Sequence, residues 1–295
     1  MADPLPKISV ITPCFNSIRT IRETIESVAA QHYPNLEHIV IDGGSNDGTV
    51  ELLRGYSHLI WVSEKDEGHY HAMNKGIQHA TGDIVVILNA DDYFCHGALE
   101  AVGNAFAAHP EWDGVFGDIR YVDGKGKEIY RRQEAKFDYD VLRFTGSCYV
   151  IHQTLFVRRQ LHDRLGLYRH KELKNACDYD FILKLGRAGC RIGHVPVYIV
   201  YYRYHDFGQS ADLRIMANLA RERAAILKEH GFPGGIAGQL LRIIFRLKRQ
   251  GQKLFYRGKC DFLPGTWHLR DHYKPRTTFA SNIGLDQLPV ETEKS

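Results

Sequence analysis

Two adjacent carboxylates, Asp91 and Asp92, follow directly after an apolar run at residues 83–88. A short run rich in Val and Ile that ends in turn-forming residues is typical of a buried parallel strand, and ligands collect beyond the carboxyl ends of such strands. Mg²⁺ or Mn²⁺ prefers oxygen ligands and commonly bridges carboxylates to nucleotide phosphates. The pair therefore predicts a site for Mg²⁺ or Mn²⁺. The alternative is that one Asp caps the helix that begins near Gly97 while the other is solvated.

A third carboxylate, Asp42, ends another apolar run and precedes the turn-rich loop 43–49. An ionised Asp only accepts hydrogen bonds, which suits it to a nucleobase N–H or a ribose hydroxyl, whereas Asp47 is more simply a turn or helix-capping residue. The glycines here match no P-loop, and no G-x-G-x-x-G follows the first strand, which ends at residues 12–16. We expect nucleotide binding without either of these phosphate loops.

Alternating strand and helix patterns must position these carboxylates. The expected strands span residues 7–15, 37–42, 59–63 and 83–88, and the expected helices span 19–31, a short stretch after Thr49, and 70–79. Such alternation predicts an α/β fold with a parallel sheet covered by helices and right-handed crossovers.

The second half of the chain is less regular. A strand at 112–122 and a charged, hairpin-like segment at 123–132 indicate that the sheet becomes mixed, and periodicity then weakens until Asp178. The later elements are a helix at 178–188, a strand at 195–202 and a helix at 213–230. The breaker cluster at 231–235 predicts a boundary between a catalytic domain, 1–231, and an appendage, 232–295.

The appendage is strongly basic, with ten Lys/Arg against two Asp between residues 236 and 276. At helical spacing the cations Arg242, Arg246, Arg249, Lys253 and Arg257 lie opposite the apolar residues Leu240, Ile243, Ile244, Leu247 and Leu254. Such a basic amphipathic helix suits the anionic surface of a membrane. The alternative is a helix packed on the catalytic domain with its basic side in water.

Bulk composition bounds the remaining possibilities. The 295 residues are 44% hydrophobic and 25% charged, with a formal net charge of +3, and no apolar stretch approaches the ~20 residues that span a bilayer. Without a visible secretory signal, we expect a cytoplasmic protein at the inner face of the cell membrane. The six cysteines form no C-x-x-C pair, and His69-Tyr70-His71 has no second Cys or His pair nearby in sequence, so we predict no structural zinc site.

Five motifs in order carry a family resemblance. They read Pro13-Cys14-Phe15-Asn16, DGGSNDGT from Asp42, SEKDEGHYHAMNKG from Ser63, TGDIVVILNADD from Thr81 and ACDYDFILKLG from Ala176. Over roughly residues 7–210 the chain resembles a family 2 glycosyltransferase. The resemblance implies a GT-A fold, with a Rossmann-like mixed sheet flanked by helices, a nucleotide-sugar donor and inversion at the anomeric carbon.

The resemblance also implies roles for individual residues. Asp42 contacts the base, Asp66 lines the donor pocket, and Asp92 with Asp91 occupies the place of the D-x-D metal motif. The implied donor-binding residues are Pro13, Phe15, Asn16, Asp42, Asp66, Lys75 and Asp91. His152 and Gln153 match positions on the acceptor side, and His205 is a candidate ligand of the metal or the diphosphate; a lone His is otherwise more often packed or solvated.

Asp178 is the expected catalytic base. Inversion in one displacement needs a base opposite the leaving group to take the proton of the attacking hydroxyl. Asp178 aligns with the Asp of the family's Glu-Asp motif, although this chain has Cys177 in place of the Glu. The alternative is that Asp178 caps a helix, and Asp180 is expected to be structural.

We therefore predict an inverting, metal-dependent glycosyltransferase that acts in assembly of a cell-surface polysaccharide or lipid-linked oligosaccharide. The expected partners are a nucleotide-sugar, foremost a UDP-sugar, a glycan or lipid-linked acceptor, and a membrane surface. Lys65, His69 and His71 depart from the pattern of relatives, so the resemblance implies no particular donor sugar. The absence of Gln-x-x-Arg-Trp after Asp178 favours transfer of a single sugar. The rivals are an inactive sugar-nucleotide binding protein and a nucleic-acid-binding module that uses the basic region, but no nucleic-acid motif accompanies it.

Overall fold

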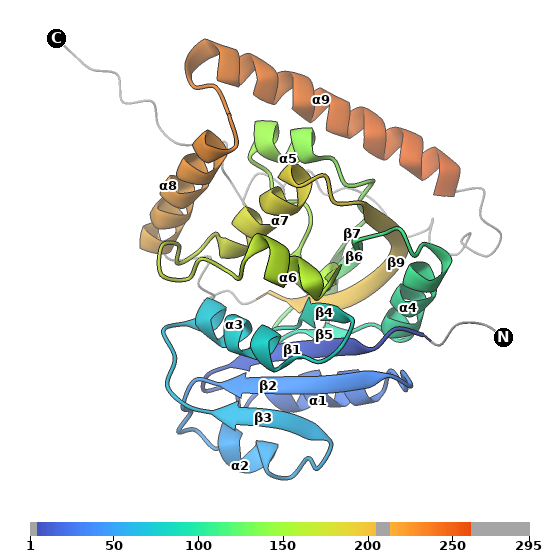
Figure 1. The fold of residues 1–295 in the computed structure, drawn as a ribbon, viewed down its shortest axis with the longest axis vertical. Coiled ribbons are helices and arrows are strands. Elements are labelled where there is room, and N and C mark those ends of the chain that lie inside the picture. Colours follow the sequence, from blue (N-terminus) through green and yellow to red (C-terminus); the bar gives the residue numbers. More distant parts are fainter. Residues whose placement is uncertain (1–4, 205–212, 261–295) are drawn as a thin grey trace. The chain divides into compact units, whose positions relative to one another are not determined.

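The computed structural model describes residues 5–204 and 213–260, with side chains to residue 255. Its contacts form one compact unit that ends at Tyr256. This division differs from the boundary expected near residue 231, because the helix that follows the breaker cluster packs on the preceding domain. Figure 1 shows the elements in chain order.

The first half is the predicted βαβ series. Strands β1 (Ile8–Cys14), β2 (Leu36–Asp42), β3 (Leu59–Ser63) and β4 (Ile84–Ile87) pair in parallel in the order β3-β2-β1-β4. The connections carry helices α1 (Ile21–Ala29), α2 (Thr49–Leu53) and α3 (His69–His79), with β1 and β4 buried along their whole length. The predicted parallel sheet is confirmed.

The second half makes the sheet mixed, as expected. The order continues β4-β8-β6-β9-β5, with β8 (Leu155–Arg158) antiparallel to both of its neighbours. Strand β6 (Gly114–Val122) pairs in parallel with β9 (Ile192–Arg203) and antiparallel with β7 (Glu128–Arg132), which confirms the hairpin. The short strands β5 (Tyr93–Phe94) and β8 were not predicted, because two to four residues carry too little periodicity to register.

Helices cover this half too. The structure contains α4 (Ala98–Ala108), α5 (Tyr139–Thr145), a 3₁₀ turn η1 (His152–Thr154), α6 (Gln160–Leu165), α7 (Cys177–Arg187), α8 (Leu213–Glu229) and α9 (Gly235–Cys260). Of these, α4, α7, α8 and α9 match expected helices, whereas α5, η1 and α6 lie where the pattern weakens and are only three to seven residues long.

Helix α3 lies directly on β1, and a glycine makes this close approach possible. A Cβ at Gly76 would stand 2.2 Å from Cγ2 of Ile11 in β1. No real side chain tolerates such a distance, so only Gly at this position lets α3 pack this closely on β1. The seating fixes the first turn of α3, which carries His69, Tyr70 and His71, beside the carboxyl end of the sheet.

Helix α9 packs through its basic side, not its apolar side. Arg249 and Lys253 form ion pairs with the buried Glu134 at 2.7 and 3.4 Å. The apolar residues Leu240 and Leu247 are 56% and 67% exposed. The alternative of a packed helix with its basic side in water is therefore wrong in orientation, because a buried carboxylate attracts the cations inward.

Candidate functional site

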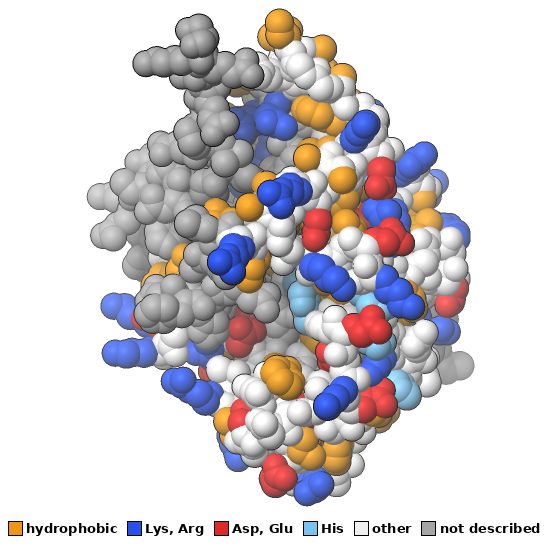
Figure 2. Space-filling view, turned by 90° about the vertical axis from the view of Figure 1, so that its left-hand side faces the viewer, with side chains coloured by type: hydrophobic (Ala, Val, Ile, Leu, Met, Phe, Trp, Pro, Cys, Tyr) orange, Lys and Arg blue, Asp and Glu red, His pale blue; other side chains and the backbone are white. Residues whose placement is uncertain are grey.

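The site is built at the carboxyl ends of β1, β2 and β4. Parallel register pairs Cys14 with Asp42, and Asp42 with Ser63, so the loops after these strands leave the sheet at one edge. The 89–92 turn follows β4 at the same edge. In Figure 2, histidine, acidic and basic side chains lie close together on one face of the molecule.

Asp42 ends β2, as predicted, but its carboxylate accepts hydrogen bonds from other groups of the protein. The side chain is fully buried, and Oδ2 accepts hydrogen bonds from the backbone N–H groups of Gly44 and Ser45 and from Ser63 Oγ, at 3.0, 2.9 and 2.6 Å. The hydroxyl of Ser45 and the thiol of Cys14 donate to Oδ1. Burial raises the pKa of Asp42, but these hydrogen bonds outweigh it and lower the pKa. Asp42 thus holds the 43–49 loop in place, and its contact with a base stays a prediction.

The segment after β1 presents an aromatic ring. Asn16 adopts a left-handed conformation, with φ of 49°, and its side-chain oxygen accepts a hydrogen bond from the N–H of Asn46 at 3.0 Å. Phe15 is 63% exposed, and its ring lies 3.4 Å from the position of a Cβ on Gly43. An exposed ring over a glycine backbone is a surface on which a flat base can stack. Pro13 is the penultimate residue of β1 and pairs with Ile41 in β2.

Asp66 and Lys75 lie around the loop that follows β3. Oδ1 of Asp66 accepts a hydrogen bond from Gly68 N–H at 2.7 Å, while a Cβ on Gly43 would be 2.7 Å from Oδ2. Asp66 therefore closes over the glycines after Asp42. Lys75 pairs with Glu64 at 2.7 Å and donates to the carbonyl oxygen of Lys65 at 3.2 Å, so it braces the same loop.

Asp91 and Asp92 differ in accessibility. Asp92 is 1% exposed; Oδ1 accepts from Arg203 N–H at 2.8 Å, and Oδ2 accepts from Gln153 Nε2 at 2.9 Å. Burial and then the charge of Asp91 raise its pKa well above the usual range. Asp91 is only partly buried. Neither residue caps α4, whose N-cap is Gly97, so the capping alternative is wrong.

These two residues fit a divalent cation. Burial and then the neighbouring charge of Asp91 disfavour the ionised form of Asp92, and a bound cation would offset both. Asp91 is the better placed ligand, because it keeps accessible surface, whereas Asp92 is 1% exposed. The remaining candidate ligand, His205, lies outside the described residues.

Asp178 lies in the first turn of α7 and is held by two side chains from distant segments. Tyr70 donates its hydroxyl to Oδ1 at 2.9 Å, and Nδ1 of His152 lies 3.5 Å from Oδ2. Burial raises the pKa of Asp178, but the hydrogen bond and charge of His152 and the bond from Tyr70 lower it to about 2. The N-cap of α7 is Ala176, without a side-chain cap, so the capping alternative is wrong. A carboxylate that is ionised at neutral pH and 24% exposed can accept a proton.

The two residues expected on the acceptor side, His152 and Gln153, have different partners in the structure. Nε2 of His152 lies 3.5 Å from Asn89 Oδ1, so His152 links Asp178 to the turn that carries Asp91. Gln153 is buried and donates through Nε2 to Oδ2 of Asp92, and its place on the acceptor side stays a prediction.

Sequence reasoning missed the roles of Tyr70, Asn89 and Arg203. Tyr70 stands within a quoted motif, but its partner Asp178 is 108 residues away, and no local pattern reports that contact. Asp180 was expected to be structural, and the structure pairs it with Arg169 at 2.7 Å and Lys184 at 3.0 Å.

Solved structures share this fold. TarS of S. aureus, residues 1–349 in complex with UDP-GlcNAc, matches with a TM-score of 0.55 and 20% identity over 81% of this chain and 79% of that chain. A mannosyltransferase of Pyrobaculum calidifontis, in complex with GDP-Man and Mn²⁺, matches with a TM-score of 0.54 and 21% identity over 86% of both chains. Of full-length TarS the chain covers 39%. These likenesses confirm the GT-A fold.

Sequence comparisons give the family. The model of glycosyl transferase family 2 matches residues 9–166. An uncharacterized glycosyltransferase of Mycobacterium tuberculosis is 36% identical over 61% of this chain and 68% of its own length. A PGL/p-HBAD biosynthesis glycosyltransferase of Mycobacterium bovis is 29% identical over 69% of this chain and 78% of its own. The chain belongs to glycosyl transferase family 2 and is a glycosyltransferase.

Proposed function

We propose that this glycosyltransferase inverts the anomeric carbon and moves one sugar from a nucleotide-sugar to an acceptor hydroxyl. The observation that carries this proposal is Asp178, an ionised, partly exposed carboxylate held by Tyr70 and His152. Direct displacement needs such a base to remove the proton of the attacking hydroxyl. Tyr70 and His152 fix the carboxylate so that no reorganisation accompanies the transfer.

The donor is proposed to lie over the carboxyl ends of β1, β2 and β4. Phe15 offers a ring for the base, Asp66 closes over Gly43, and Asp91 faces the diphosphate. A Mg²⁺ or Mn²⁺ ion at Asp91 supplies positive charge that offsets the charge developing on the leaving diphosphate. The complexes of the structural neighbours with UDP-GlcNAc and with GDP-Man and Mn²⁺ support this class of donor, and we favour a UDP-sugar.

The acceptor is proposed to be a growing glycan or a lipid-linked sugar in cell-surface assembly. Support comes from the relative named for PGL/p-HBAD biosynthesis. The side of Asp178 that faces away from Tyr70 and His152 is where an acceptor hydroxyl must come within about 3 Å.

Ligand-dependent stability tests the donor assignment. UDP-, GDP- and dTDP-sugars are each added with Mn²⁺ or Mg²⁺, and unfolding temperatures are compared, because a ligand that binds only the folded state raises its stability. NMR of the product then reports the anomeric configuration. Retention of configuration, or stabilisation by every nucleotide-sugar without a metal ion, contradicts the proposal.

We further propose that α9 contacts an anionic membrane through its apolar face. In the described part of the chain no helix is long and apolar enough to cross a bilayer. Helix α9 contains no Asp or Glu, and its exposed apolar residues are Ile236, Leu240, Ile243, Ile244, Leu247 and Leu254. Lys248, at 43% exposure, lies among them and pairs with Asp138 at 2.8 Å. Apolar side chains that enter the headgroup boundary, with cations beside them, are the pattern of an interfacial helix. Membrane residence at the inner face of the cell membrane follows from this proposal.

Vesicle co-sedimentation tests this contact. The double variant Leu240→Gln with Leu247→Gln is expected to leave anionic vesicles, whereas Ile60→Gln, at a residue 46% exposed on β3, is expected to stay bound like the wild type. Wild-type protein that remains in the supernatant at low salt contradicts membrane contact. Arg249 and Lys253 are unsuitable for this test, because both pair with Glu134.

A further inference from the structure

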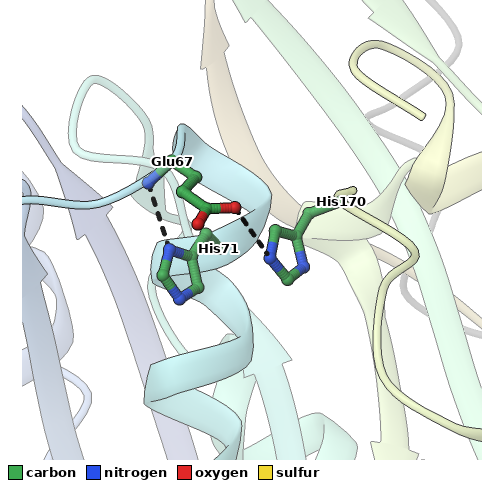
Figure 3. Close-up of side chains that lie close together, drawn as sticks. All are labelled: Glu67, His71 and His170. Carbon is green, nitrogen blue, oxygen red and sulfur yellow. Dashed lines mark hydrogen bonds and ion pairs between the residues drawn. The ribbon is translucent and has the colours of Figure 1, made fainter. Parts of the chain in front are cut away.

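Two histidines and a glutamate meet beside the proposed base. Glu67 precedes α3, His71 lies in its first turn, and His170 comes from the segment between α6 and α7 (Figure 3). One ligand atom from each lies within 4.8 Å of the other two. The two imidazole rings stack face to face, with centroids 4.7 Å apart. Only the fold brings His170 to a helix 99 residues earlier in the chain.

The ring of His170 is held in place, but one of its nitrogens has no hydrogen-bond partner among the described residues. Nδ1 lies 3.0 Å from Asn74 Nδ2 and 3.4 Å from the carbonyl oxygen of Tyr168. The amide nitrogen of Asn74 can only donate, and its orientation is fixed because it also donates to the carbonyl oxygen of Tyr168 at 2.8 Å. Nδ1 therefore accepts, the neutral ring carries its proton on Nε2, and an ion that binds at Nε2 must displace that proton. Nε2 is buried and makes no hydrogen bond to any described residue, and it lies 3.6 Å from Oε2 of Glu67.

The other two members can adjust. Nδ1 of His71 already presents a lone pair, because it accepts a hydrogen bond from Glu67 N–H at 3.0 Å. An ion that binds there replaces this single hydrogen bond. The side chain of Glu67 is 59% exposed and can rotate inward. Ligand atoms around a tetrahedral ion lie about 3.3 Å apart, given bonds of about 2.0–2.1 Å, so binding must draw the three groups together.

We propose that Glu67, His71 and His170 bind a transition-metal ion of the Zn²⁺ class. Imidazole nitrogen suits Zn²⁺, Co²⁺ and Ni²⁺, whereas the carboxylates at Asp91 and Asp92 suit Mg²⁺ or Mn²⁺. The two sites therefore select different ions. The bound ion links the loop after β3, which carries Asp66, to the segment before α7, the helix that carries Asp178. It therefore holds the two sides of the candidate site together.

Calorimetric titration of Zn²⁺ into the full chain, without a histidine tag or nucleotide and with excess Mg²⁺, tests the site. The wild type is expected to bind one ion, and His71→Gln and Glu67→Gln are each expected to weaken its affinity by about tenfold or more. Co²⁺ is expected to give visible absorption bands that disappear in His71→Gln. Because Glu67 is exposed, Glu67→Gln tests the site even where loss of the His170 contacts unfolds a His170 variant.

The matched control is an exposed pair elsewhere, His109 and Glu111, whose atoms lie 3.4 Å apart. His109→Gln is expected to leave Zn²⁺ affinity and the Co²⁺ bands unchanged. Wild-type protein that binds no Zn²⁺ under excess Mg²⁺ overturns the proposal. So does binding that is equal in the wild type, His71→Gln and Glu67→Gln, since the chain has other histidines that can bind the ion.

Discussion

The carboxylates on the two sides of the candidate site differ in burial and in their hydrogen-bond partners. On the side built by β1, β2 and β4, Asp42 and Asp92 are buried, and their oxygens accept hydrogen bonds from backbone and side-chain donors of the protein. On the side built by α7, Asp178 is partly exposed and is held by Tyr70, His152 and the backbone N–H of Tyr179. The same residue type therefore stabilises loops at Asp42 and Asp92 and remains available to a ligand at Asp178.

This difference teaches that a carboxylate at the end of a strand is not a ligand by position alone. A carboxylate already satisfied by several donors gains little from one more partner. Asp91, Asp66 and Asp178, which retain accessible surface, are the stronger candidates for contact with substrates. The following substitutions test this division.

The largest effect is expected at Asp178. Asp178→Asn keeps the shape but removes the base, so turnover is expected to fall by roughly 10²-fold or more while donor affinity stays near wild type. Steady-state kinetics and calorimetry of donor binding measure the two quantities. Asp163→Asn, at an exposed aspartate, is the control. Transfer near the wild-type rate in Asp178→Asn removes this residue from the chemistry.

The next effect separates the adjacent aspartates. Asp91→Asn is expected to abolish metal-supported donor binding, because the amide loses the charge that attracts the cation. Asp92→Asn is expected to retain much of that binding, since Gln153, whose Oε1 has no partner among the described residues, can turn to accept from the new amide. Calorimetric titration of each variant with nucleotide and Mn²⁺ measures the two affinities. The reverse order of losses would restore Asp92 as the principal ligand, as the sequence suggested.

Asp42→Asn is expected to lower the free energy of unfolding. An amide nitrogen would face the donors that Asp42 accepts from, and an unsatisfied buried group costs about 1–3 kcal/mol. Urea unfolding without ligand measures this loss, with Asp163→Asn again as the reference. Unchanged stability combined with lost nucleotide affinity would instead show that Asp42 serves the base directly.

The last expected effect is a dependence of the free energy of unfolding on pH. Burial lowers the pKa of His38 in β2 to about 3 and that of His162 in α6 to about 4; the charge of His58 adds to the shift at His38. Both stay neutral in the folded protein below the ordinary value of 6.5, while the unfolded chain takes up protons. Stability is therefore retained above pH 6.5 and falls as the pH drops toward 4, by up to about 1.4 kcal/mol per unit for each histidine.

Substitution of each buried histidine tests whether that residue causes the loss of stability in acid. His38→Gln is expected to flatten the pH dependence by about one proton between pH 6.5 and 4, and His162→Gln by a similar amount. His96→Gln, at an exposed residue, should leave the slope as it is. An unchanged slope in both buried variants would assign the acid sensitivity to other groups.

The amino-acid sequence determined the parallel half of the sheet, the long helices, the mixed character of the second half and the family. These follow from patterns that repeat within ten to twenty residues, and from motifs whose residues are neighbours in the chain. Strand β8 was missed because pairing with β4 and β6, which are distant in the chain, stabilises it. Helices α5 and η1 were missed because they are only seven and three residues long.

Only the tertiary structure decided how the site residues divide their roles. Burial of Asp42 and Asp92 depends on donors from neighbouring loops, and the position of Asp178 depends on Tyr70, 108 residues before it. The inward turn of the basic side of α9 depends on Glu134, and the histidine pair depends on His170 meeting His71. Periodicity shows that a helix has two faces, but which face is covered depends on the charge and shape of the surface that it meets.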